Sequence, residues 1–133
     1  MPATSNMTIL NAFTEALGRF DYDAAFVHVA DDCEYRNMAE PSVVHVGPAA
    51  ARRVLEPFFG ATVENEFVVV RAAENGPVVM AERLDRHKLK DGRWVELPVT
   101  GVYEIHDGKI TVWRDYVDAQ SIASKWPAPL AMA

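Results

Sequence analysis

Apolar residues recur at helical spacing in the first part of the chain. Over residues 6–17 they stand at i, i+3 and i+7, namely Leu10, Phe13 and Leu17. This spacing predicts a helix that Ser5 caps and Gly18 ends. Asp21 opens a second predicted helix, which Asp31-Asp32 ends and whose buried stripe consists of Tyr22, Ala25, Phe26 and Val29.

A third helix is predicted from Gly47-Pro48, after a short strand over residues 33–38. Proline suits the first position of a helix, where its missing N–H would have no partner in any case. The apolar side of this helix consists of Val54, Leu55, Phe58 and Phe59. Pro57 cannot donate a hydrogen bond to the carbonyl of Arg53, so we expect a kink or an early end at this point.

From residue 62 the pattern changes to segments rich in β-branched and aromatic residues. Four predicted strands cover residues 63–71, 78–89, 94–105 and 109–117, and turn signals containing glycine separate them. Three successive hairpin connections predict a four-stranded antiparallel meander. Asp118 caps a predicted closing helix through Trp126, which Pro127 stops. We expect no regular structure from Ala128 to Ala133.

Helices that precede a curved, mainly antiparallel sheet predict an α+β fold. The chain has 133 residues, close to the commonest domain size, and half of them are apolar, which is enough for a core. We therefore expect one domain over residues 1–133, with an ordered part over about residues 6–126. A sheet of this length that wraps around a helix leaves a pocket between its concave face and the helices.

Charge and composition exclude several kinds of partner. The net charge is -6 and the acidic residues are spread along the chain, so there is no basic stripe for a nucleic acid. A single cysteine, Cys33, excludes a disulfide within the chain. No signal peptide and no apolar stretch of membrane-spanning length is present, so we expect a cytoplasmic protein without a membrane partner.

Two further expectations concern metals and assembly. The four histidines do not have the spacing of metal ligands, so we expect no metal site: His28, His45, His87 and His106. An open sheet commonly needs its outer face covered, so we expect a homodimer.

Five polar residues offer acid–base chemistry. Tyr35 and Asn37 stand two residues apart, as do Arg83 and Asp85, and this spacing puts both members of each pair on one face of a strand. Asp115 lies in the last predicted strand. Together they provide two carboxylates, a guanidinium, a phenol and an amide, without a Ser or Cys nucleophile.

Hairpin register decides whether these residues meet. Between the last two strands, a two-residue turn would pair Thr100 with Asp115, and a three-residue loop would pair Val99 with it. We expect the three-residue loop there and at residues 90–92, because each then places Gly at the position that needs positive φ. The result is a row of Arg83, Val99 and Asp115, with Asp85 and Leu97 beside it.

The same face carries the residues that we expect to line the pocket. Five apolar residues share it: Val79, Ala81, Leu97, Val99 and Val117. His87 has the same orientation along its strand, where it either lines the entrance of the pocket or lies at a solvated strand end. Met38 and Phe58 complete the expected lining, although a place in the helix core explains Phe58 equally well. A charged group in such surroundings needs a partner, and the arginine is long enough to contact both carboxylates.

Each polar residue also has an ordinary structural interpretation. Alone, Arg83 and Asp85 suit an exposed ion pair, Tyr35 a core tyrosine, and Asn37 a turn residue. The three tryptophans suit core or subunit contacts. Asp115 is harder to explain, because aspartate is depleted in strands. The combination of all five residues favours a catalytic site.

Three segments resemble the limonene epoxide hydrolase family: Tyr35-Arg-Asn-Met38, Glu82-Arg-Leu-Asp85 and Gly108-Lys-Ile-Thr-Val-Trp-Arg-Asp-Tyr116. The resemblance covers about residues 8–122 in the order of elements. It implies a cone-shaped, barrel-like α+β fold with N-terminal helices packed on the sheet. Ketosteroid isomerases, SnoaL-like polyketide cyclases and nuclear transport factor two share this fold.

The resemblance implies a one-step opening of a small apolar epoxide, cyclic or terpene-like, to a vicinal diol without a cofactor or a covalent intermediate. Asp115 would accept a proton from water that Tyr35 and Asn37 help to hold. Asp85 would protonate the epoxide oxygen, and Arg83 would orient both carboxylates.

The chain departs from the family pattern at residues 39–46, which form a longer segment, and at Pro57 in the third helix. Both border the pocket, so they concern the identity of the substrate more than the chemistry. Two other functions remain open on the same fold: a ketosteroid-isomerase-like isomerase or cyclase, and a non-catalytic protein that binds a small molecule.

Overall fold

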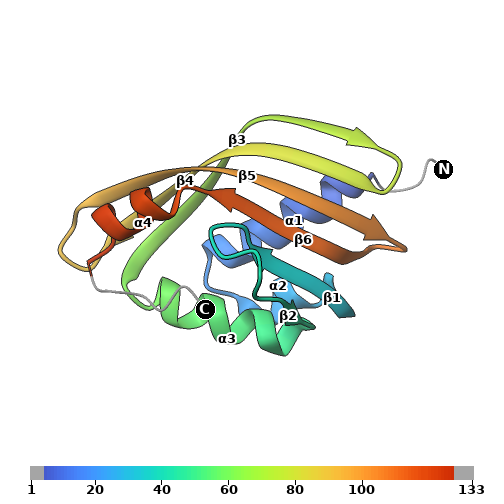
Figure 1. Cartoon of the computed structure of the whole chain (residues 1–133), viewed down its shortest axis with the longest axis horizontal. Coiled ribbons are helices and arrows are strands. Elements are labelled where there is room, and N and C mark those ends of the chain that lie inside the picture. Colours follow the sequence, from blue (N-terminus) through green and yellow to red (C-terminus); the bar gives the residue numbers. More distant parts are fainter. Residues whose placement is uncertain (1–4, 128–133) are drawn as a thin grey trace.

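The computed structural model describes residues 5–127, so the predicted irregular segment from Ala128 to Ala133 lies outside the described residues. The helices are α1 (Asn6–Gly18), α2 (Tyr22–Phe26), α3 (Pro48–Phe59) and α4 (Ala119–Lys125). The strands are β1 (Val29–Asn37), β2 (His45–Val46), β3 (Thr62–Asn75), β4 (Val78–Leu89), β5 (Trp94–His106) and β6 (Lys109–Val117). The predicted α+β class is confirmed (Figure 1).

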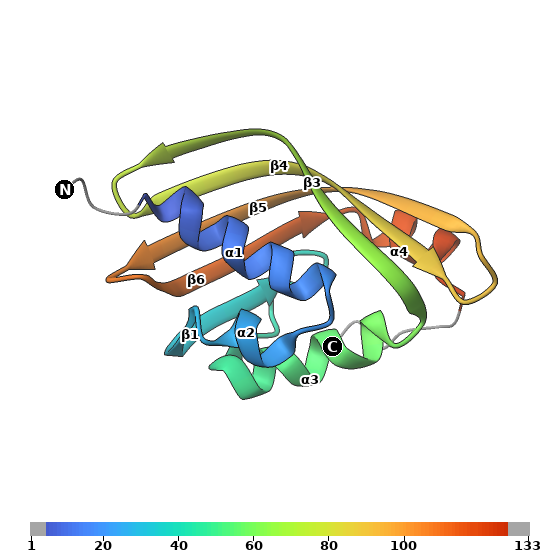
Figure 2. The ribbon, with the colours of Figure 1, turned by 180° about the vertical axis from the view of Figure 1, so that it is seen from behind.

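The sheet has six strands in the order β2-β1-β6-β5-β4-β3. Strands β3 to β6 form the predicted antiparallel meander, and β1 joins its edge in parallel with β6. Among the described residues the sheet is open, because β2 and β3 each have one neighbour. Breaks in register at the start of β3 and in its middle mark bulges, which bend a strand. The long β3–β4 hairpin arches over the helices (Figure 2).

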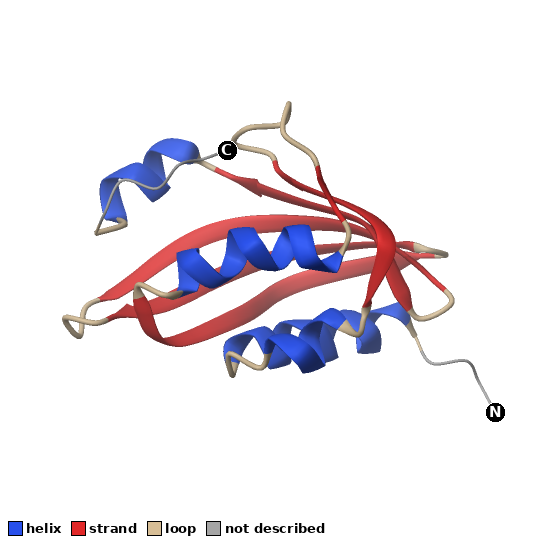
Figure 3. Ribbon diagram, turned by 90° about the horizontal axis from the view of Figure 1, so that it is seen from below, coloured by secondary structure: helices blue, strands red, loops and turns tan. Residues whose placement is uncertain are grey.

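Helix α1 covers one end of the concave face of the sheet, and its buried side consists of Leu10, Phe13, Thr14, Ala16 and Leu17. The Ser5 hydroxyl caps this helix as predicted, accepting a hydrogen bond from the N–H of Thr8 at 3.3 Å. Viewed from below, α3 lies in front of the strands, between the α1–α2 pair and α4 (Figure 3). None of the described helices is long and apolar enough to cross a membrane.

The predicted end of the second helix is wrong. Helix α2 stops at Phe26, and β1 already begins at Val29, which pairs with Ile110 of β6. Asp31 and Asp32 therefore lie within β1, where both are exposed and the register is irregular. The helical pattern of apolar residues continued beyond Phe26 only as far as Val29. Pairing of that residue with β6 therefore decides its conformation as a strand.

The expected early end of α3 at Pro57 is also wrong, since the helix continues to Phe59. Pro57 lies in the last turn, where it removes only the hydrogen bond to Arg53. The N–H of Gly60 still donates to the carbonyl of Glu56 at 2.8 Å and completes the turn.

Candidate active site

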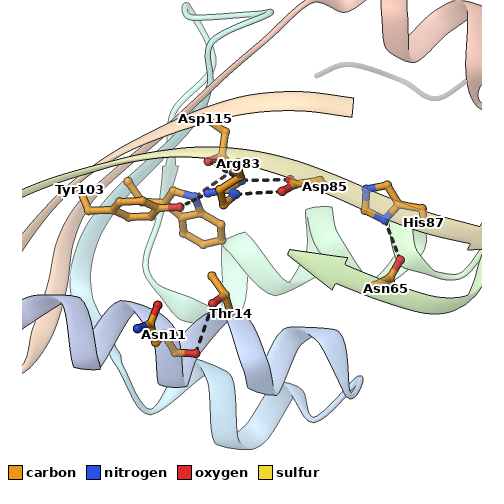
Figure 4. A network of polar contacts seen from close by, with 9 residues as sticks. Asn11, Thr14, Asn65, Arg83, Asp85, His87, Tyr103 and Asp115 are labelled. Carbon is orange, nitrogen blue, oxygen red and sulfur yellow. Dashed lines mark hydrogen bonds and ion pairs between the residues drawn. The ribbon is translucent and has the colours of Figure 1, made fainter. Parts of the chain in front are cut away.

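The charged residues gather around Arg83 in the middle of β4. Its guanidinium binds Asp85 side-on, with Nε donating to Oδ1 at 2.9 Å and Nη2 donating to Oδ2 at 3.0 Å. Nη2 also donates to Oδ1 of Asp115 at 3.3 Å, and Nη1 donates to the hydroxyl of Tyr103. Figure 4 shows the four side chains meeting over the sheet. One guanidinium thus connects both candidate carboxylates.

This cluster is buried, with 5% of Arg83 and 6% of Asp85 exposed. The ordinary interpretation of the pair as an exposed salt bridge is therefore wrong. The next arginine on the same strand, Arg86, has that character: it binds Glu66 and Glu96 at the surface. The two arginines differ in burial because successive side chains of β4 point alternately to its inner and outer face.

The register between β4 and β5 follows the predicted three-residue loop. Gly92 has a φ of 91°, the left-handed conformation that glycine adopts readily. As predicted, Arg83 lies opposite Val99 and Asp85 lies opposite Leu97.

Our prediction that Val99 lies opposite Asp115 is wrong. The β5–β6 hairpin turns through two residues, Asp107-Gly108, with φ values of 51° and 77° that suit a two-residue turn. A bulge that contains Thr111 then shifts the register by one residue. As a result, Asp115 lies opposite Gly101.

Gly101 makes room for the cluster. A Cβ atom at this position would lie 2.5 Å from the hydroxyl oxygen of Tyr103 and 2.7 Å from Nη1 of Arg83. Because Gly101 has no side chain, the guanidinium extends from β4 across β5 toward Asp115 on β6. We did not predict a role for Gly101, although a glycine inside a strand often marks a close approach of another group.

Two donors hold the carboxylate of Asp115. Arg83 donates to Oδ1, and the indole Nε1 of Trp113 donates to Oδ2 at 3.1 Å. Trp113 and Asp115 stand two residues apart on β6, the same spacing as in the pairs that the sequence singled out. We had assigned Trp113 to core or subunit contacts; it is buried in the core and also fixes this carboxylate.

Strand β1 brings the phenol and the amide to the same place. In the parallel pairing, Tyr35 lies opposite Trp113 and Asn37 lies opposite Asp115. The ring of Tyr35 stacks on the indole with a centroid distance of 3.9 Å. Oδ1 of Asn37 accepts a hydrogen bond from the backbone N–H of Ala39 at 3.0 Å, and its NH₂ group has no hydrogen-bond partner within residues 5–127.

Burial sets the charge states in this cluster. It raises the pKa of Asp85, an effect that the ion pair with Arg83 opposes and the nearby Asp115 reinforces. Burial works against the charge of Arg83, but its neighbours Tyr103, Asp115 and Asp85 hold the pKa of the guanidinium well above its usual value. Burial also raises the pKa of Tyr35 and of Tyr103, so both remain neutral phenols.

The cluster opens into a cavity of about 330 Å³ between the sheet, α1 and α3. All five candidate polar residues line it, and most of the remaining wall is apolar or aromatic: Phe13, Leu17, Val54, Leu55, Phe58, Phe59, Phe67, Leu97, Val99, Trp113, Val117 and Ile122. In residues 5–127, no three His, Cys, Asp or Glu side chains come close enough to hold a metal ion.

The predicted lining is partly correct. Phe58, His87, Leu97, Val99 and Val117 line the cavity.

The other three predicted lining residues, Met38, Val79 and Ala81, do not line the cavity. Val79 and Ala81 are fully buried in the core beneath α1, which fills that end of the concave face. Met38 follows the end of β1, where its backbone N–H donates to the carbonyl of Asp115 at 2.8 Å.

Tyr103, whose hydroxyl contacts Arg83, is a further site residue that we did not predict. It stands two residues after Gly101 and four after Val99, so strand alternation places it on the same face. Strand alternation therefore indicated Tyr103 in the sequence, but the wrong β5–β6 register placed Val99 opposite Asp115 in its stead.

We expect Gly101→Ala to distort the cluster, because the added methyl group would overlap Tyr103 and Arg83. Overpacking of this kind costs about 1–3 kcal/mol of unfolding free energy, which urea denaturation measures. Thr100→Ala, one residue away on the exposed face, is the matched control and should change stability little. Equal stability of the Gly101→Ala variant and the wild type would contradict the contact.

The raised pKa of Asp85 predicts a pH dependence of stability. Between the unfolded and the folded pKa of Asp85, the folded state binds more protons, so the contribution of Asp85 declines as pH rises through the raised pKa. Carbon-13 NMR of the carboxyl groups should show Asp85 titrating above its usual value. Exposed Asp91, whose pKa the hydrogen bonds from Arg93 lower, is the internal control. A titration of Asp85 at or below that of Asp91 would refute the assignment.

Comparison with solved structures shows the fold. An NTF2-like protein of Burkholderia pseudomallei superposes with a TM-score of 0.81 at 16% identity, over 95% of this chain and 100% of that chain. A SnoaL-like protein of Shewanella putrefaciens superposes with a TM-score of 0.79 at 15% identity, over 93% of this chain and 97% of that chain. These likenesses confirm the predicted cone-like fold.

Other comparisons show the family. The model of the limonene-1,2-epoxide hydrolase catalytic domain matches residues 4–128. Epoxide hydrolase EphG of Mycobacterium tuberculosis is 33% identical over 109 residues, which cover 82% of this chain and 70% of that relative. The structure of an M. tuberculosis LEH-like epoxide hydrolase superposes with a TM-score of 0.73 at 29% identity, over 88% of this chain and 85% of that chain. This protein therefore belongs to the limonene-1,2-epoxide hydrolase family.

Proposed function

We propose that this protein is a cofactor-independent epoxide hydrolase that adds water to a small epoxide and forms a vicinal diol in one step. The observation that carries the proposal is the single buried guanidinium that binds two carboxylates at the wall of an apolar cavity. Family membership supports the same reaction.

Asp115 is the proposed base. It faces the cavity, and two donors fix its carboxylate, so a water molecule can approach it in a defined direction. Asn37 and Tyr35 also line the cavity. In the proposed reaction they hold the water oxygen while Asp115 removes one of its protons, which makes that oxygen nucleophilic.

Asp85 is the proposed acid. Its raised pKa favours the protonated form that an acid must have, in spite of its contact with Arg83. In the proposed step, the water oxygen bonds to one epoxide carbon as the C–O bond to the ring oxygen breaks. That ring oxygen takes the proton of Asp85. The first proton reaches Asp115, so neither free hydroxide nor a free alkoxide forms.

The charge of Arg83 suits this division of roles. With both carboxylates ionised the cluster carries a net negative charge, and with one protonated it is neutral. A buried site favours the neutral arrangement. Arg83 contacts both carboxylates at once, so transfer of a proton from one side to the other through the substrate keeps the net charge of the cluster constant.

The cavity limits the size and polarity of the proposed substrate. Its volume of about 330 Å³ is small for a ligand pocket, a class that covers roughly 300–1,000 Å³. The aromatic and aliphatic walls favour a hydrocarbon framework. Cyclic and terpene-like epoxides, including limonene epoxide, fit this description.

We expect Asp85→Asn and Asp115→Asn each to lower turnover of a cyclic epoxide by at least about a hundredfold, because each removes one proton-transfer group. Asp118→Asn, which keeps a side-chain oxygen at the cap of α4 outside the cavity, is the matched control and should retain activity. Circular dichroism checks that each variant is folded.

A single turnover in ¹⁸O-labelled water tests the one-step route. All of the new oxygen in the diol should carry the label. Unlabelled oxygen from an enzyme carboxylate would contradict direct attack by water, and absence of diol from a panel of epoxides would refute the proposed function.

We also propose that two copies associate through the outer face of the meander. Val68 on β3, Met80 on β4 and Tyr116 on β6 project from that face, with 41%, 50% and 44% of their surface exposed. Apolar exposure across three strands is typical of a surface that another protein covers. Light scattering should give twice the mass of one chain, and Met80→Lys should reduce it. A wild-type mass equal to that of one chain would refute association.

A further inference from the structure

A second polar group lies in the cavity beyond the charged cluster. His87 stands two residues after Asp85 on β4, faces the same side and is 2% exposed (Figure 4). Its ring is surrounded by aromatic residues at centroid distances of 5.1–6.2 Å: Phe58, Phe59, Phe67 and Trp126. The sequence left open a solvated strand end for this residue, and its burial excludes that interpretation.

A chain of three hydrogen bonds fixes the protonation of His87. The Thr62 hydroxyl lies 2.7 Å from the carbonyl of Phe59, which can only accept, so the hydroxyl donates its one hydrogen there. The Asn65 NH₂ group donates to that same hydroxyl at 3.0 Å, which leaves Asn65 Oδ1 toward the ring. Nδ1 of His87, at 2.6 Å from this oxygen, must therefore be the donor.

The consequence is a neutral imidazole whose Nε2 carries a lone pair. Burial and the nearby Arg83 lower the pKa of His87 to about 4, which agrees with a neutral ring at neutral pH. The carbonyl of Phe59 can only accept, and this fixes which group donates in each hydrogen bond of the chain through Asn65. The proton of the neutral ring therefore stays on Nδ1. His87 lines the cavity, and a ligand that fills the cavity would strip water from this acceptor, which is costly unless the ligand supplies a donor.

We infer that His87 selects epoxides that carry a hydroxyl group remote from the ring being opened, by accepting a hydrogen bond at Nε2. The inference rests on the proposed epoxide hydrolysis and adds the substrate class. Residues two apart on a strand are roughly 7 Å apart, so the hydroxyl belongs at the far end of a small ring or side chain. The apolar walls disfavour a cationic donor, because they offer its charge no partner.

Two matched substrates test this inference. One is a cyclohexene oxide with a hydroxymethyl group on the carbon opposite the epoxide, and the other has an ethyl group there. The wild type should prefer the hydroxymethyl substrate by about tenfold in kcat/KM, as expected for one buried hydrogen bond. His87→Leu should lose this preference while it still opens the ethyl substrate. Phe58→Leu, which changes the same wall without an acceptor, should keep the preference.

A binding measurement separates this inference from the proposed function. In protein labelled with ¹⁵N-histidine, Nε2 of His87 should have the shift of an unprotonated nitrogen, and cyclohexylmethanol, which has no epoxide, should move that shift. Ethylcyclohexane should not. Turnover of both epoxides without a preference, or an Nε2 shift that cyclohexylmethanol leaves unchanged, would overturn the inference. Absence of any turnover together with the Nε2 response would refute the hydrolase and retain the hydroxyl site.

Discussion

The ion pair between Arg83 and Asp85, shared with Asp115, is the interaction on which the rest of the site depends. A guanidinium with 5% exposure is stable only if its donors are satisfied and its charge is balanced. Three strands contribute to that balance: β4 supplies Arg83 and Asp85, β5 supplies Tyr103, and β6 supplies Asp115. The neighbouring residues serve this arrangement either by donating a further hydrogen bond or by leaving space.

The same interaction creates a functional tension. A carboxylate that binds arginine through both oxygens normally lacks the proton that a general acid must donate, because the contact stabilises the ionised form. Here burial outweighs the contact and raises the pKa of Asp85. The second carboxylate adds to this effect, since two negative charges beside one positive charge are costly in an apolar cavity. Stability and proposed chemistry therefore draw on one set of contacts.

Much of the fold could be predicted from local patterns. Glycine turns and alternating apolar residues defined β4 and β6 with the bounds that the structure has, and side-chain caps defined the starts of α1, α2 and α4. Tertiary pairing could not be read in this way. The early start of β1 at Val29 depends on its partner β6, which lies far away in the sequence.

The candidate site, like the fold, could be predicted only where it depends on local sequence patterns. Residues two apart on one strand, such as Arg83 and Asp85, share a face whatever the register. Contacts between strands depend on the register, which is why Gly101 and Tyr103 were missed. The hydrogen-bonded chain from His87 to Thr62 joins β4 to β3 and has no local signal at all.

The bulge at Thr111 has a further consequence for how this hairpin can change in evolution. If Thr111 paired regularly and did not bulge, Asp115 would lie opposite Thr100, which faces outward, and Trp113 and Val117 would turn outward with it. Loss of the Thr111 codon, in contrast, would remove the bulge and leave Asp115 opposite Gly101. The inner face of β6 therefore depends on the bulge absorbing one residue, and a hairpin shorter by that residue would keep the same face.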